Sequence, residues 1–69
     1  MDANKLKTKI IENGLNVDKI SKQIGINRST FYRKMRSGRF TIGEAKSIAD
    51  ALSLTFRDSK TIFFNHDIA

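Results

Sequence analysis

The sequence contains no cysteine and a single histidine, His66, close to its C-terminal end. Without cysteine there is no disulfide framework and no thiolate site, and this absence suits a reducing cytoplasm. One histidine, which lies near the C-terminal end, cannot supply the histidine cluster of a metal site. We therefore expect a cytoplasmic protein that binds neither a metal nor a cofactor.

Long apolar runs are also missing. No stretch approaches the roughly 18 apolar residues that a membrane-spanning helix needs. The first residues, Met-Asp-Ala-Asn-Lys, lack the charged start and the apolar block of a signal peptide. From these absences we expect neither membrane insertion nor export.

No catalytic constellation is visible either. The side chains that could serve as nucleophile, acid or base are scattered among capping and packing positions; they are Ser21, Ser29, Lys34 and Glu44. A chain of 69 residues makes one domain at most and buries only roughly 60% of its unfolded surface, which leaves no pocket-sized core behind such groups. We expect the protein not to be an enzyme.

Positive charge is in excess, +6 in total, and it is concentrated in one half of the chain. Residues 1–40 contain ten basic and three acidic side chains, whereas residues 41–69 contain three basic and four acidic ones. A one-sided basic field is expected of a protein that binds a polyanion, although solubilising surfaces also show it. We favour nucleic acid over a membrane surface, because Lys7 lies round the helix from Lys5 and Lys9 and the three form no single strip.

Residues 17–36 predict two short helices that meet at a glycine. Apolar residues recur at helical spacing on both sides of Gly25; they are Val17, Ile20 and Ile24 before it and Ile26, Phe31 and Met35 after it. Gly25 can end the first helix in a left-handed conformation, and Asn27 can cap the second. The pattern is that of a helix-turn-helix.

Three further helices are predicted around this pair. The first begins after Asp2 or Asn4 and ends in a Schellman stop at Gly14. Thr41 and Glu44 form a capping box before a helix whose apolar stripe contains Ile42, Ala45, Ile48, Ala49 and Leu52. A short fifth helix begins at Thr55 or Phe56. The predicted fold class is therefore all-α, a compact bundle of about five short helices that forms one domain over residues 1–69.

The second motif helix, which begins at Arg28, has two unlike faces. Phe31 and Met35 lie four residues apart and share the inward side. The outward side carries arginines, hydroxyl groups and one aromatic ring, from Arg28, Ser29, Tyr32, Arg33 and Arg36. Because arginine can bind a guanine edge with two hydrogen bonds or bind a phosphate, this side is the candidate for reading DNA. A solvated basic helix face is the alternative.

The centre of the chain reads Ile20-Ser21-Lys22-Gln23-Ile24-Gly25-Ile26-Asn27-Arg28-Ser29-Thr30-Phe31-Tyr32. This run resembles the motif of the lambda-repressor-like family, also called the Cro/repressor or XRE family. The likeness covers nearly the whole chain and is sharpest to small phage-encoded regulators and prophage repressors. Two positions depart from the family pattern: Val17 replaces a frequent Gln, and Ser21 replaces a small Ala, which is tolerable if its hydroxyl bonds to helix carbonyls.

The resemblance implies a second motif helix that enters the major groove of double-stranded DNA. We expect base reading by Arg28, Ser29, Tyr32, Arg33 and Arg36. We expect contacts to the DNA backbone from Lys22, Asn27, Thr30, Lys34 and Arg39.

The last predicted helix ends with Ile62, Phe63 and Phe64 in a row. Consecutive helical residues diverge by about 100°, so at least one of the three is exposed unless a partner covers it. In the family that the chain resembles, the last helix often forms the dimer contact. We expect a weak homodimer through Phe56, Ile62, Phe63 and Phe64; the alternative is that this end folds back on its own core.

These features predict a sequence-specific transcriptional regulator, a phage or prophage repressor or a Cro-like protein. A dimer would bind a near-palindromic operator whose half-sites lie about one helical turn, roughly 34 Å, apart. The alternative is a protein-interaction module, such as an antitoxin, an antirepressor or an adaptor, with weak DNA affinity that is indifferent to sequence. Single-stranded nucleic acid is disfavoured, because Tyr32 alone is a poor stacking platform.

Overall fold

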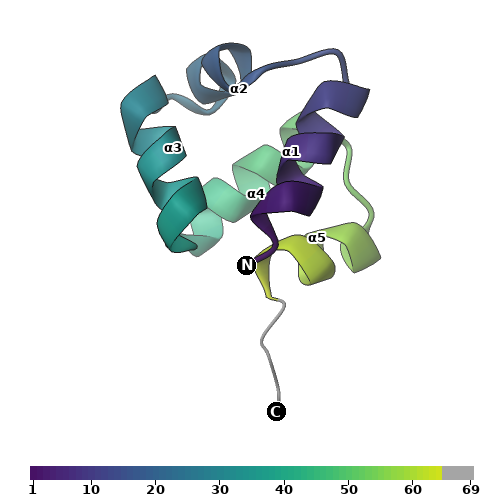
Figure 1. Cartoon of the computed structure of the whole chain (residues 1–69). Helices are drawn as coiled ribbons and strands as arrows, with labels where there is room; N and C mark the ends of the chain where they lie inside the picture. Colours follow the sequence, from purple (N-terminus) through teal and green to yellow (C-terminus); the bar gives the residue numbers. More distant parts are fainter. Residues whose placement is uncertain (65–69) are drawn as a thin grey trace.

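Five helices make up the part of the chain that the computed structural model describes, residues 1–64, and no strand occurs there. They are α1 (Ala3–Glu12), α2 (Val17–Ile24), α3 (Arg28–Ser37), α4 (Ile42–Ala51) and α5 (Phe56–Phe63) (Figure 1). The predicted all-α bundle is confirmed, and α2 and α3 are the helix-turn-helix pair. His66 lies outside the described residues.

Each helix begins at a short polar residue whose side-chain oxygen accepts a hydrogen bond from a backbone N–H of the first turn. These N-cap residues are Asp2, Asn16, Asn27, Thr41 and Thr55, with donor to acceptor distances between 2.7 and 3.0 Å. Glu44 completes the predicted capping box, since its Oε1 accepts from the Thr41 N–H at 2.8 Å. A cap contributes about 1 kcal/mol, so residues local to each helix determine where it begins.

The turn between α2 and α3 depends on Gly25, whose φ is +78°. A residue with a side chain would lose about 1 to 2 kcal/mol in this left-handed conformation. After the turn, the Ile26 N–H donates to the Ser21 carbonyl at 3.0 Å and satisfies one of the last carbonyls of α2. The predicted stop at Gly14 forms in the same way, with the Leu15 N–H donating to the Ile10 carbonyl at 3.0 Å.

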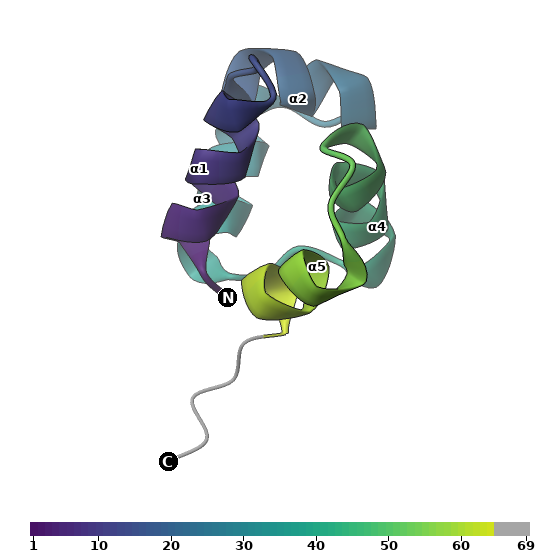
Figure 2. The same cartoon turned by 90° about the vertical axis from the view of Figure 1, so that its right-hand side faces the viewer.

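The helices surround one core. In Figure 2, α2 lies across the top and α5 across the bottom, with α1 and α4 on opposite sides. The chain start is tied to α5, because the Asp2 N–H donates to the Ile62 carbonyl at 2.7 Å. In Figure 1, α3 lies at the left edge of the bundle, so one side of this helix faces outward.

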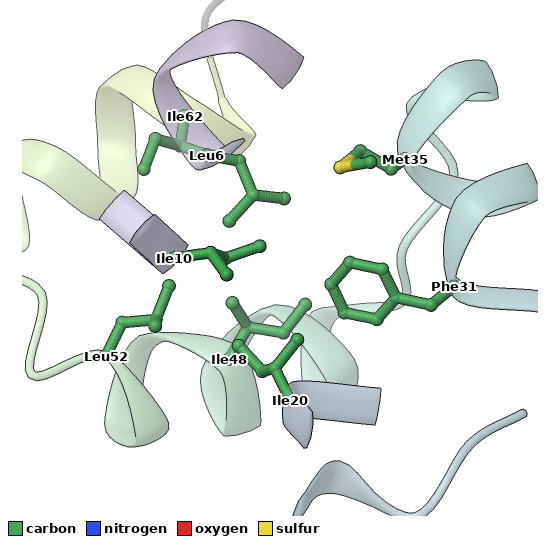
Figure 3. Packing of buried hydrophobic residues seen from close by; sticks show 8 residues of the cluster. All are labelled: Leu6, Ile10, Ile20, Phe31, Met35, Ile48, Leu52 and Ile62. Carbon is green, nitrogen blue, oxygen red and sulfur yellow. The ribbon is translucent and has the colours of Figure 1, made fainter. Parts of the chain in front are cut away.

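Eight buried apolar side chains, from all five helices and from the residue that follows α4, meet at the centre (Figure 3). They are Leu6, Ile10, Ile20, Phe31, Met35, Ile48, Leu52 and Ile62. The Phe31 ring meets Phe40 edge to face at a centroid distance of 5.1 Å, and Phe40 meets Phe63 in the same way at 6.1 Å. Aromatic contacts therefore run from Phe31 in the core, through Phe40, to Phe63 on α5.

Ser21 is buried, and its hydroxyl donates to the Asp18 carbonyl at 3.0 Å. Serine is therefore tolerated where the family usually has alanine, because its hydroxyl is hydrogen-bonded to a carbonyl within α2.

Two side chains lie elsewhere than the sequence suggested. The prediction that Ile42 belongs to the buried stripe of α4 is wrong: Ile42 is 79% exposed, because it is the first residue of α4 and lies one turn before Ala45, where the buried stripe begins. Ile62, which was assigned to a dimer interface, is 0% exposed within the core. Since it has no surface to offer, a second copy of the chain cannot contact it while this core is intact.

Candidate nucleic-acid interface

The outward side of α3 carries the five residues predicted to read bases, Arg28, Ser29, Tyr32, Arg33 and Arg36, and all five are exposed. We call this set the α3 face. Phe31 and Met35, on the other side of the same helix, are buried in the core. Because these two anchors fix how α3 is turned about its axis, the α3 face is held toward the outside.

Arg28 and Tyr32 lie one turn apart on α3 and contact each other. The guanidinium carbon of Arg28 is 5.8 Å from the centroid of the Tyr32 ring. Such a cation–π contact is worth about 0.5 to 1 kcal/mol at an exposed site and restrains both side chains. Among residues 1–64, no arginine of the α3 face forms an ion pair with a carboxylate. The guanidinium groups therefore remain available to an external acceptor.

Lys34, predicted to contact a DNA phosphate, has a partner inside the protein. Its Nζ donates to Glu44 Oε2 at 2.6 Å, and both side chains are mostly buried. This hydrogen bond is the main reason that the pKa of Glu44 lies below its ordinary value, and it outweighs desolvation, which acts in the opposite direction. Glu44 Oε1 simultaneously accepts from the Thr41 N–H. The pair thus joins α3 to the capping box of α4.

Two lysines of α1 are also engaged internally. Lys5 Nζ and Lys9 Nζ lie 3.4 and 3.3 Å from the carboxylate oxygens of Asp58 on α5. Desolvation alone would raise the pKa of Asp58, but hydrogen bonds and charge from Lys9 and Lys5 together lower it. These contacts hold α1 against α5 and leave less of the charge on that side for a ligand.

The other predicted backbone-contact residues surround the α3 face. Asn27 lies at its start, where its Oδ1 accepts from the Ser29 N–H at 2.7 Å, and the exposed Arg39 follows its end. Thr30 is half-buried on α3. Lys22 on α2 has only a long 3.9 Å contact to Asp18, and its side chain is 79% exposed. Of the predicted backbone lysines, Lys22 is thus the one that is free to reach a phosphate.

Sequence reasoning overlooked Lys7 as a neighbour of this surface. It lines a hollow together with Tyr32 and Arg36 of the α3 face, on the side of α1 that is turned away from Asp58. In residues 1–64 it has no ion-pair partner, in contrast to Lys5 and Lys9. The spacing of the lysines could have indicated this, since on a helix Lys7 points to a different side from Lys5 and Lys9.

Within the described part of the chain, none of the helices has the length and apolar character to cross a membrane. The same residues contain no group of three or more His, Cys, Asp or Glu side chains placed to hold a metal ion.

A helix pair joined at a left-handed glycine, with an outward basic second helix, defines a helix-turn-helix protein of the DNA-binding class. The family model described as Cro/C1-type HTH DNA-binding domain matches residues 5–58, which include α2 and α3 entirely. The chain belongs to this family, and the resemblance noted in its sequence is confirmed. Comparisons with curated proteins and with solved structures gave no significant match.

Proposed function

We propose that the protein is a sequence-specific transcriptional regulator of double-stranded DNA, a phage or prophage repressor or a Cro-like protein acting in the cytoplasm. The observation that carries this proposal is the α3 face, whose three arginines are exposed and have no carboxylate partner in residues 1–64. Family membership supports it, since the matching domain is described as DNA-binding.

In this proposal α3 lies in the major groove. Arg28, Arg33 and Arg36 bind guanine edges or nearby phosphates, and Ser29 and Tyr32 donate or accept through their hydroxyl groups. Contacts to the DNA backbone come from exposed or polar groups around α3; they are Lys22, Asn27, Thr30 and Arg39. Lys34 is left out of this set, because its Nζ is bonded to Glu44 and would have to leave that carboxylate to reach a phosphate.

The proposed dimer uses the surface where the start of α4 meets the end of α5. A hollow there is lined by apolar side chains, among them Ile42, Ala45, Phe63 and Phe64. Ile42 and Phe64 are both large and exposed, which makes this surface suited to covering by a second copy. Phe56 is at the other end of α5, about 12 Å along the helix axis from Phe64, so we place it outside the interface.

Selection of randomised duplexes by the purified protein at moderate salt tests the function. A near-palindromic consensus, with half-sites about one helical turn apart and an affinity about a thousandfold above background, is the expected result. Enrichment of no sequence, together with a steep salt dependence, would mean that the α3 face provides only generic charge. The protein would then be better explained as a protein-interaction module.

A further inference from the structure

A groove lies between α1 and α3, next to the α3 face. It consists of two adjoining hollows that share Lys7, Tyr32 and Met35 as lining residues. The first has a volume of about 360 Å³ and is completed by Ala3 and Arg36. The second, of about 310 Å³, continues toward the start of α2 and is lined further by Ile10, Ile11, Leu15 and Val17. We call the two together the α1–α3 groove.

The second hollow is built mostly from apolar side chains, and Lys7 and Asn16 are its polar lining residues. Ile10 and Met35 are core residues that reach its floor, and Leu15 is half-buried beside them. Ile11 borders it with 73% of its surface exposed, and the Tyr32 ring borders it with 42% exposed. A phosphate backbone gains nothing from isoleucine and leucine side chains, whereas apolar side chains of another protein would be removed from water here. The lining therefore suits a protein better than DNA.

The first hollow adds positive charge to this apolar surface. Lys7 and Arg36 line it, and no acidic side chain lines either hollow. Arg28, stacked on Tyr32, adds a third cation close by. A matching ligand is apolar along one side and acidic next to it.

We propose that the α1–α3 groove binds an acidic, amphipathic helix of a protein partner. The ten residues of α1 extend about 15 Å, which matches about three turns of a docked helix with apolar anchors at positions i, i+4 and i+7. The anchors pack between Ile11 and Tyr32, and the acidic side chains reach Lys7 and Arg36. Tyr32 and Arg36 also belong to the α3 face, so partner and DNA exclude each other; this last consequence rests on the proposed function.

The test is a selection of displayed random peptides of about 14 residues, or four helical turns, on the purified full chain. The expected result is enrichment of sequences that are acidic and carry apolar residues at helical spacing. A synthetic copy of the enriched peptide should bind Ile11→Glu at least about tenfold more weakly than the unmodified protein, as measured by fluorescence anisotropy. Phe56→Glu is the matched control, because Phe56 is a large exposed apolar side chain on α5 that lies outside both the groove and the proposed dimer interface, and this variant should bind the peptide as the unmodified protein does.

Three results would overturn the proposal: no enrichment, enrichment of peptides without this pattern, or equal loss of binding in the two variants. Sedimentation of the two variants without peptide gives a further test. If Ile11→Glu had a lower association state and the control variant did not, a second copy of the chain would occupy the groove, and the proposal would be overturned as well. Circular dichroism shows whether both variants are folded. Displacement of a selected duplex by the peptide tests the exclusion separately, and if no duplex can be selected the proposed function fails while the peptide result stands.

Discussion

Replacing Lys34 by methionine separates a structural from a DNA-binding role of this lysine. Methionine keeps an unbranched apolar side chain, but the 2.6 Å hydrogen bond to Glu44 is lost. A hydrogen bond to a charged group contributes about 1.5 to 3 kcal/mol and an exposed ion pair only about 0.2 to 1, and this mostly buried pair lies between these cases. We expect the free energy of unfolding to fall by about 1 kcal/mol, which lowers the Tm of a domain of this size by about 4 to 8 °C.

The loss of stability should depend on pH in a direction that Glu44 determines. Because the hydrogen bond from Lys34 lowers the pKa of Glu44, the pair stabilises the fold fully above the ordinary pKa of a glutamate. This stabilisation disappears as the pH falls through the lowered pKa, where Glu44 becomes protonated. The difference in Tm between the unmodified protein and Lys34→Met should therefore be largest near neutral pH and vanish in acid. Thermal unfolding followed by circular dichroism over a pH series measures it.

Lys22→Met is the matched control, because it removes the same charge from an exposed side chain that has only a long internal contact. It should leave the Tm unchanged and reduce the slope of log affinity against log salt by about 0.9, the value for one phosphate contact on duplex DNA. Lys34→Met should leave that slope unchanged. The reasoning would be refuted if Lys34→Met reduced the salt slope and left the Tm where it was.

Three further substitutions test the core packing, the turn between α2 and α3, and the proposed dimer interface. Phe31→Ala should cost about 3 to 5 kcal/mol of an unfolding free energy that is only about 3 to 10 kcal/mol for 69 residues; urea denaturation measures it, and a loss below 1 kcal/mol would contradict the packing described. Gly25→Ala should cost only the backbone strain of about 1 to 2 kcal/mol, because an added Cβ meets no atom within 4 Å; a much larger drop in Tm would reveal a steric contact. Phe64→Asp should shift sedimentation from dimer to monomer while Phe56→Asp does not, and equal behaviour of the two variants would remove the proposed interface.

Features that depend on neighbours in the chain could be predicted from the sequence. The N-caps at Asn16, Asn27 and Thr41 each need only one backbone N–H two or three residues away. The stops at Gly14 and Gly25 likewise follow from one residue that tolerates a positive φ. The apolar spacing then identified which side of α3 is buried, and so which side could contact a ligand.

Features that depend on distant partners could not be predicted. Lys34 is a basic residue on the helix predicted to bind DNA, so the sequence suggested a phosphate contact. In the folded chain, Glu44, ten positions further on, lies within hydrogen-bond distance of Lys34. Ile42 has the spacing of the apolar stripe of α4, but the buried part of that stripe begins one turn later, at Ala45. Which of Ile62, Phe63 and Phe64 is buried could not be predicted, because it depends on how α5 is placed on the core. Charge and apolar character are visible in a sequence, but their availability to a ligand is decided by packing.

We expect side chains of the α3 face to read bases in double-stranded DNA. The most direct test of this claim runs the randomised-duplex selection in parallel with the unmodified protein, Arg33→Ala and Lys22→Ala. Arg33→Ala should lose preference at one base pair in each half-site, with a cost of about 1 to 3 kcal/mol on the original sequence. Lys22→Ala should recover the unchanged consensus with uniformly weaker binding. The same consensus from all three proteins, or none from any, would contradict the claim.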